Sequence, residues 1–470
     1  MTPEESSESQ QHHAGDEYER EPVPKKARLG ANKFWGMYAG EHAAGTEFMI
    51  GPLFLLAGVS LQNIFLGLLV GNFFAVLSWR FLCAPIGVNA RYTLYYHLEK
   101  IAGGNLVKLY NAANGLLFCF LAGAMITVSA TAVGIPFNME MPGIADIYPN
   151  SALFVAIVIG VGLVIAFVAA LGYETVSKFA NIAAPWMVLV FLACGAVALK
   201  QLEVTSWSSL EKIWTESIVL AQGGTNESTM GFWSVAFFAW FCNAAMHVGM
   251  ADLSVFRFAK KASYGWASAA GMYVGHYMAW IAAALMLAAQ IKLTQDTNPV
   301  PGPMANQVVG IAGIICVIVA GWTTANPTIY RAGLAFQALM PSTSRAKVTF
   351  VAGLVATVAG VFPAFAWKLL GFVGLYGTIL APMGGIIFFD WYFRRKGNVE
   401  AFHAARSANS FNLVVLFAWL VPVGIAVFLI KTQGIAAHFF PLPCWIACGL
   451  IYLLLSRRAE NSAATSKPAL

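Results

Sequence analysis

Long apolar runs recur along almost the whole chain, from about Trp35 to Leu455, and they constrain the fold more than any other feature. A membrane-spanning helix needs roughly 20 mostly apolar residues. Twelve such runs lie at 36–55, 59–82, 105–133, 151–171, 179–199, 230–256, 264–291, 305–336, 348–365, 368–392, 411–430 and 434–455. We therefore predict an all-α integral membrane protein with twelve transmembrane helices.

Lys and Arg residues concentrate in every second gap between these runs. Of the 28 Lys and Arg residues, 23 lie on the side that holds both chain ends, and Arg331 is counted with these 23. The five on the other side are Lys200, Lys212, Lys292, Lys368 and Lys431. Because cytoplasmic loops of membrane proteins are enriched in positive charge, we predict a multi-pass protein of the plasma membrane with both termini in the cytoplasm.

The composition agrees with a chain that lies mostly in lipid. Hydrophobic residues make up 59% of the sequence and charged residues 11%, whereas a soluble domain carries about 25% charged residues. The net charge of +6 therefore reflects membrane orientation, and we expect no nucleic-acid partner. The expected partners are the lipid bilayer and a small-molecule substrate, with no obligate protein partner. The seven Cys show no metal-ligand spacing and imply no disulfide framework.

Polar segments flank the apolar part of the chain. Residues 1–34 lack the apolar core of a signal peptide, and we predict that they form a disordered cytoplasmic tail. Residues 35–455 form the twelve-span domain. Residues 456–470 are predicted to form a second cytoplasmic tail.

The first and sixth spans are unusually polar for their depth in the membrane. The ionisable and amide side chains that they carry are Glu41, His42, Glu47, Asn243, His247 and Asp252. Ionisable groups at this depth are costly and usually line a functional cavity. Gly40, Gly45 and Gly249 lie beside them, where a helix can open. If these spans correspond, the chain holds a five-plus-five repeat, and two unwound helices face each other at the midplane and bind ions or polar solutes. The alternative is polar packing between helices.

The eighth span carries neutral oxygen groups that suit a hard cation. It reads Ala320-Gly-Trp-Thr-Thr-Ala-Asn-Pro327, so Thr323 and Thr324 offer hydroxyls and Ala320 offers a carbonyl one turn earlier. Hard cations prefer oxygen ligands. The alternative is that each hydroxyl bonds back to the preceding turn of its own helix.

Three segments carry a family resemblance. They are Trp322–Leu334, Ala251–Phe258 and Ala381–Tyr392, with weaker support from Val70-Gly-Asn72. These segments resemble the nucleobase–cation symporter-1 family, which includes cytosine, hydantoin and allantoin carriers. The resemblance implies the five-plus-five inverted repeat of the leucine transporter, with broken helices 1 and 6. Ten core spans would lie in 36–392 and two extra spans in 411–455.

The resemblance also implies site residues. A sodium ion would be held by the side chains of Thr323 and Thr324 and by the carbonyls of Ala320, Glu41 and Ala44. The solute would stack on Phe118 and contact other residues of spans three, six and eight: Asn114, Trp240, Phe241, Asn243 and Asn326. The sequence departs from the family where Ala320 replaces an Asn that recognises cytosine, where Phe118 replaces Trp, and where Glu41 and His42 add ionisable groups. Glu41, His42 and His247 therefore leave proton coupling open.

Twelve spans with both ends inside are typical of secondary transporters. We expect a cation symporter that imports a small, planar, nitrogen-rich solute, such as a purine, cytosine or a related heterocycle, by alternating access. Sodium or a proton would be the coupling ion, with no other cofactor. Neither His-Glu-x-x-His nor Gly-x-Ser-x-Gly occurs, so we do not expect an enzyme. The alternatives are a proton-coupled carrier of another small organic solute and a membrane sensor or receptor that does not transport.

Overall fold

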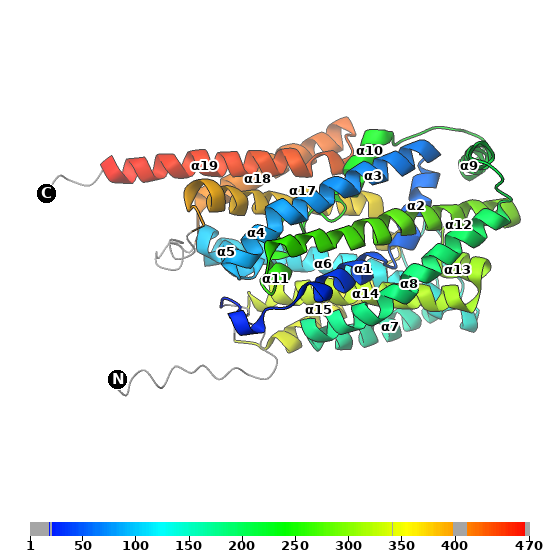
Figure 1. Ribbon diagram of the computed structural model, residues 1–470, viewed down its shortest axis with the longest axis horizontal. Helices are drawn as coiled ribbons and strands as arrows, with labels where there is room; N and C mark the ends of the chain where they lie inside the picture. The colour runs from blue at the N-terminus through cyan, green and yellow to red at the C-terminus, as the bar shows by residue number, and fades with distance from the viewer. Residues whose placement is uncertain (1–17, 19–20, 341, 398–410, 466–470) are drawn as a thin grey trace.

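The computed structural model describes residue 18 and residues 21–340, 342–397 and 411–465. In this part the chain is almost entirely helical, and the long helices run side by side along one direction (Figure 1). Eight of its segments are long and apolar enough to cross a membrane. These are Leu61–Ala90, Gly104–Val133, Ala152–Ala170, Glu174–Gln201, Ala262–Thr294, Ile311–Gln337, Leu369–Arg394 and Leu413–Gln433. The predicted all-α membrane fold is confirmed.

The first and sixth spans are each divided into two helices. In the first, α1 (Ala31–His42) and α2 (Glu47–Leu56) are separated by four residues without helical structure. In the sixth, α10 (Phe232–Phe241) and the short α11 (Leu253–Phe256) flank a longer unwound segment, 242–252. The predicted interruptions at these two places are confirmed.

The other long helices overlap the predicted spans, and shorter helices lie between them. They are α3 (Leu61–Ser78), α4 (Ala84–Ala90), α5 (Leu94–Ala102), α6 (Gly104–Val133), α7 (Ala152–Ala170), α8 (Tyr173–Gln201), α9 (Trp207–Ala221), α12 (Met278–Thr294), α13 (Pro301–Val309), α14 (Ile311–Gln337), α15 (Arg345–Gly360), α16 (Ala364–Trp367), α17 (Leu369–Phe389), α18 (Leu413–Gln433) and α19 (Pro441–Thr465). A π-helical segment, η6 (Ala270–Tyr277), leads into α12.

Several boundaries differ by a few residues, and the eighth span shows one physical cause. The eighth span was predicted at 305–336, but Gly310 has a φ of +62° and ends α13, so the spanning helix α14 begins only at Ile311.

The helices of the spanning region form two groups. In the first group, α2 packs on α12, α10 packs on α3, and α1 packs on η6. In the second, α14 packs along α6, and α15 packs against both α6 and α7. α8 contacts both groups, through α1 and α12 on one side and α14 on the other. The two broken helices belong to the first group. The unwound segment of the first span touches α14 at Gly321, and that of the sixth packs against α17 at Gly377 and Gly384.

The two ends of the described chain lie at one end of the bundle. The described segment before α1 and the end of α19 lie toward the left of Figure 1, and α9 and α13 lie at the opposite end. Ordered structure starts earlier than the predicted tail boundary at 34, because Val23 is buried and Leu29 pairs with Ala259. At the other end, α19 continues through the predicted tail as far as Thr465. Residues 1–17 and 466–470 of the two predicted tails lie outside the described residues.

Candidate functional site

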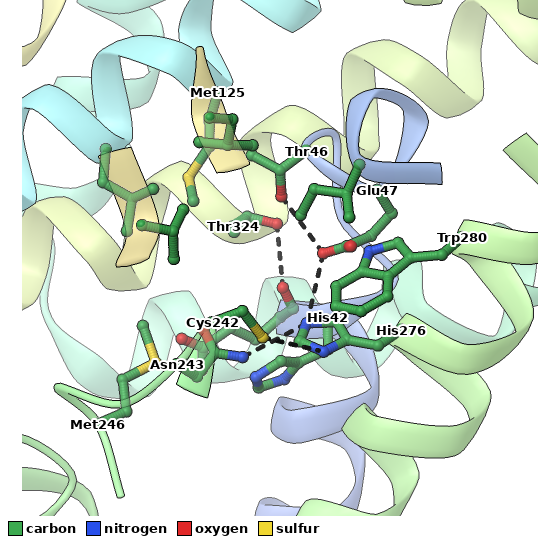
Figure 2. A pocket seen from close by; sticks show the side chains of 15 residues that line it. His42, Thr46, Glu47, Met125, Cys242, Asn243, Met246, His276, Trp280 and Thr324 are labelled. Carbon is green, nitrogen blue, oxygen red and sulfur yellow. Dashed lines mark hydrogen bonds and ion pairs between the residues drawn. The ribbon is translucent and has the colours of Figure 1, made fainter. Parts of the chain in front are cut away.

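A small cavity lies where the two unwound segments meet the second helix group (Figure 2). The space open to the centre of a water molecule is about 40 Å³, which is room for roughly three waters at 10–15 Å³ each. Its polar lining residues are Glu41, His42, Thr46, Glu47, Cys242, Asn243, His276 and Thr324. Its apolar lining residues are Ile50, Leu121, Met125, Met246, Trp280, Leu369 and Val373.

Close backbone contact explains why the first span opens at Gly45. A Cβ on Gly45 would lie 2.8 Å from the Cα of Gly321 in α14, which is closer than side chains tolerate. The missing side chain therefore lets the unwound segment touch α14 directly.

The unwound segment of the sixth span uses side chains to satisfy freed backbone groups. The Nε2 of His247 lies 2.9 Å from the carbonyl oxygen of Trp240, and Trp445 Nε1 donates to the carbonyl of Val248 at 2.8 Å. Met250 adopts a φ of +69°, which is uncommon for a bulky residue. Non-helical backbone at membrane depth is tolerated where protein surrounds it or water fills it.

Neutral oxygens from α1 and α14 gather beside the cavity. Thr324 Oγ1 lies 3.1 Å from the carbonyl oxygens of both Glu41 and Ala320, and Thr323 Oγ1 lies 3.0 Å from the Ala320 carbonyl. Four of the five groups predicted to bind sodium are thus brought together. The fifth, the carbonyl of Ala44, accepts a hydrogen bond from the backbone N–H of Glu47. This donor set fits a hard monovalent cation, and in the structure the same hydroxyls bond back to the preceding turn.

A buried ion triad lies on the other side of Glu41. Arg331 Nη2 donates to Glu41 Oε2 at 3.2 Å and to Asp252 Oδ1 at 2.8 Å, and Arg331 Nη1 also bonds to Glu41. Tyr38 Oη and Trp79 Nε1 each donate to Asp252 Oδ2 at 2.7 Å. All three charged side chains are at most 2% exposed. Counting Arg331 with the loop charges was wrong, because it lies inside α14 and joins α1, α14 and the start of α11.

Glu47 and His276 form a second buried pair at the cavity wall. His276 Nε2 lies 3.5 Å from Glu47 Oε1 and 3.4 Å from the side-chain nitrogen of Asn243. Figure 2 shows His276 at the centre of these contacts, with Cys242 Sγ 3.8 Å from its Nδ1. The His276 ring stacks on Trp280 with centroids 4.4 Å apart and an angle of 15°. His42 packs edge-on against the His276 ring, with centroids 4.9 Å apart.

The structure separates the predicted site residues into two sets. Asn243 of the predicted solute residues lines the cavity, as do Glu41, His42 and Thr324 of those predicted for the coupling ion. Phe118, Asn114, Trp240, Phe241, Asn326 and His247 do not. Phe118, which was predicted to stack on the solute, therefore lies outside the lining of this cavity.

Most residues of the second set have contacts outside the cavity. Phe118 is fully buried and meets Tyr376 of α17 edge-on at 5.5 Å. Asn114 donates to the hydroxyl of Tyr95 at 3.1 Å, and Trp240 Nε1 donates to Ser78 Oγ at 2.9 Å. The Phe241 ring stacks on that of Trp240. Asn326 lies two residues after Thr324, which turns it to another face of α14.

Sequence reasoning missed several lining residues, above all His276 and Trp280. Glu47 was noted as a charge at membrane depth but was not assigned to the site. His276 carried a usable signal, since an ionisable residue inside an apolar run marks a functional site by default. Trp280, Leu121 and Met125 carried none, because apolar side chains in an apolar helix do not reveal the face they occupy.

Comparisons by sequence find no matching family model and no matching curated protein. Comparison by structure finds the transporter Mhp1, of the nucleobase-cation-symport-1 family, in a closed conformation with bromovinylhydantoin bound. The TM-score is 0.72 and the identity 15%, over 95% of this chain and 96% of that one. The inward-facing conformation of Mhp1 matches with a TM-score of 0.67 at 14% identity, over 96% of each chain.

Two further solved structures share the fold. A Na⁺-coupled sialic acid symporter, in a substrate-bound outward-open state, matches with a TM-score of 0.60 and 14% identity, over 93% of this chain and 91% of that one. A manganese transporter of Eremococcus coleocola, in complex with an aromatic bis-isothiourea compound, matches with a TM-score of 0.56 and 12% identity, over 93% and 98%. The predicted leucine-transporter-like fold is confirmed.

Proposed function

We propose that this chain is a cation-coupled secondary transporter that imports a small, planar, nitrogen-rich solute such as a nucleobase or a related heterocycle. One observation carries the proposal: residues at the unwound segments of both broken helices line a single cavity, and its lining combines polar and apolar side chains. Broken helices that meet at mid-depth supply free backbone groups for ions and solutes in transporters of this architecture.

The cavity lining suits a flat heterocycle. Asn243 offers both a donor and an acceptor to the edge of such a ring. Trp280 offers an aromatic wall, and its Nε1 has no partner among the residues that the structure describes. An aromatic wall beside a few directional polar groups selects planar solutes with polar edges. For this cavity we propose Trp280, in place of Phe118, as the ring on which the solute stacks.

A cation at the α1–α14 oxygens would link the two helix groups. The carbonyl of Glu41 belongs to the first group, and Thr324, Thr323 and the Ala320 carbonyl belong to the second. A bound sodium ion stabilises the arrangement in which these elements touch, and this arrangement also closes the solute cavity. Movement of the first group against the second then exposes the cavity to each side in turn.

A metal ion as the transported solute has less support. Among the described residues, no group of three or more His, Cys, Asp and Glu side chains is placed to hold a metal ion. The oxygens beside the cavity suit a coupling cation instead.

The test is uptake of labelled heterocycles by the purified protein in lipid vesicles. A thermal-shift screen of nucleobases, hydantoins and allantoin first selects solutes, because a ligand of the folded state raises the melting temperature. We expect accumulation of at least one selected solute that requires an imposed cation gradient. Binding of a heterocycle without any accumulation would favour the receptor alternative.

The Asn243→Ala variant locates the site. Loss of a buried hydrogen-bond partner costs about 1–3 kcal/mol, so the half-saturation concentration should rise roughly 5- to 150-fold. The matched control is Asn226→Ala, in the exposed loop after α9, which should leave uptake unchanged. Parental affinity in Asn243→Ala would place the solute elsewhere.

A further inference from the structure

The carboxyl group of Glu47 is buried in the cavity wall without a fixed positive partner. Glu47 opens α2 directly after the unwound segment, and it is 2% exposed. The Thr46 hydroxyl donates to its Oε1 at 3.3 Å, and its Oε2 has no hydrogen-bond partner in the described part of the chain. The one ion-pair partner it has among the described residues is His276.

Burial of an unpaired carboxylate is unfavourable by several kcal/mol, even after the protein relaxes. The pair avoids this cost when it holds one proton. The proton lies either on the carboxyl group, beside a neutral imidazole, or on the imidazole, beside a carboxylate. Both forms carry no net charge, so the pair is stable in a closed cavity only when the proton is present.

The other titratable groups around Glu47 bond elsewhere, with one exception: His42 Nε2 has no hydrogen-bond partner among the described residues, and its ring contacts that of His276, so His42 is the one neighbour able to exchange a proton with the pair. From α1, Glu41 is bonded to Arg331, and His42 Nδ1 lies 2.9 Å from the carbonyl of Tyr38. From the segment after α10, the thiol of Cys242 faces His276. The charged residues of α9 have partners within that helix. Lys212 forms an ion pair with Glu216, and the indole N–H of Trp207 donates to Glu211. The cavity residues of α6, α14 and α17 do not ionise: Leu121, Met125, Thr324, Leu369 and Val373.

We propose that Glu47 and His276 form a proton-binding site, and that one proton crosses the membrane on this pair with each solute. The inference rests on the proposed function, because it names a coupling ion for that transport. A proton from water on one side forms an O–H bond on Glu47 or an N–H bond on His276. The bond breaks to water on the other side, and no electron transfer or further reactant is involved.

The position of the pair explains why proton and solute would move together. Glu47 adjoins the unwound segment of the first span, and His276 contacts Asn243 in the unwound segment of the sixth. Both side chains also line the solute cavity. The empty, deprotonated cavity would enclose a bare carboxylate, so closure is favoured only after the proton binds.

The first experiment compares two transport modes in vesicles, with uracil, hypoxanthine and hydantoin each supplied in labelled form. Exchange of labelled for unlabelled solute needs no proton release, whereas accumulation driven by a pH gradient does. Glu47→Gln keeps the size of the side chain and cannot release a proton. We expect this variant to retain exchange and to lose accumulation by at least tenfold, together with the solute-driven change of internal pH. Equal loss of both modes, or pH-driven accumulation at the parental level, overturns the proposal.

A second experiment needs no solute. Infrared difference spectra between alkaline and acidic pH report protonation of carboxyl groups in the intact protein. We expect a carboxyl band of the parent protein to be absent from Glu47→Gln and present in Glu216→Gln, which removes an exposed carboxylate of α9. The proton site is overturned when the pH-difference spectrum of the parent contains neither a carboxyl band that Glu47→Gln removes nor an imidazole band that His276→Gln removes.

The two experiments separate the two proposals. Heterocycle accumulation that follows sodium and moves no protons overturns proton coupling and leaves the proposed transport intact. A Glu47 band in a protein that moves none of the three heterocycles supports the proton site and rejects the proposed solute class.

Discussion

Glu41 and Glu47 lie on either side of the break in the first span, and each is 2% exposed, yet their surroundings differ. Glu41 is bonded to the guanidinium of Arg331, which stays charged at all physiological pH values. Glu47 faces the imidazole of His276, which gains and loses a proton in this range. The same residue type therefore forms a permanent link on one side of the break and a proton-sensitive contact on the other.

The permanent link joins elements of both helix groups. Arg331 lies in α14, whereas Glu41 and Asp252 lie in the two broken helices. With ordinary ionisation the triad has one positive and two negative charges, and the hydroxyl of Tyr38 and the indole of Trp79 stabilise the extra carboxylate. We expect this link to hold the first group against the second in the closed state.

The largest expected effect is loss of the positive charge from the triad. Arg331→Met leaves two buried carboxylates unpaired, which should destabilise the protein by about 3–5 kcal/mol. Thermal unfolding of the purified protein measures this as a lower melting temperature. The triple variant Glu41→Gln, Asp252→Asn and Arg331→Met removes every charge and should recover much of the loss. If Arg331→Met is as stable as the parent protein, the triad does not hold the two helix groups together.

Loss of one oxygen next to Glu41 should have the next largest effect. Thr324→Ala removes the hydroxyl that lies 3.1 Å from the Glu41 carbonyl. A contact to a charged group contributes about 1.5–3 kcal/mol, so the sodium concentration for half-maximal uptake should rise roughly 10- to 150-fold. Thr215→Ala in α9 is the control. Uptake of the parent protein that ignores sodium but follows a pH gradient would assign coupling to the Glu47 side alone.

The Glu47→Gln variant should change stability far less than Arg331→Met does. If the pair already holds a proton, a neutral amide of the same size replaces a neutral pair, and we expect a change below about 1 kcal/mol. Thermal unfolding near neutral pH gives the comparison directly. A loss as large as that of Arg331→Met would mean that Glu47 is a fixed charge with a structural partner.

The smallest effect is expected at an exposed ion pair. Lys292 donates to Glu203 at 2.9 Å outside the apolar core, and it lowers the pKa of this glutamate. A lowered pKa in the folded state makes the pair favourable above the usual glutamate pKa, and the benefit disappears as the pH falls through the lowered value. Because the glutamate is exposed, Lys292→Met should leave the melting temperature unchanged within error at neutral pH. A clearly lower melting temperature of Lys292→Met would show that this surface ion pair also stabilises the fold.

The amino-acid sequence predicted which helices are unwound, but it did not predict which side chains contact each other. The polar residues in spans one and six and the threonines of span eight were recognisable, because charged and hydroxyl groups are rare at that depth. Phe118 and Asn326 were not placed well. Successive residues of an α-helix are rotated by about 100°, so Asn326 points to another face of α14 than Thr324. Phe118 lies nearly one turn from Leu121, at the level of Tyr376.

The sequence by itself determined that this is a helical membrane protein with interruptions in its first and sixth spans, since lipid excludes charge and irregular backbone unless protein or water surrounds them. Only the tertiary structure decided which charges became partners. Glu41, Asp252 and Arg331 are far apart in the chain, as are Glu47 and His276, and packing of separate helices brings each set together. A buried charge requires a partner, but the requirement does not say which one, so the distinction between a permanent link and a proton site follows from the fold.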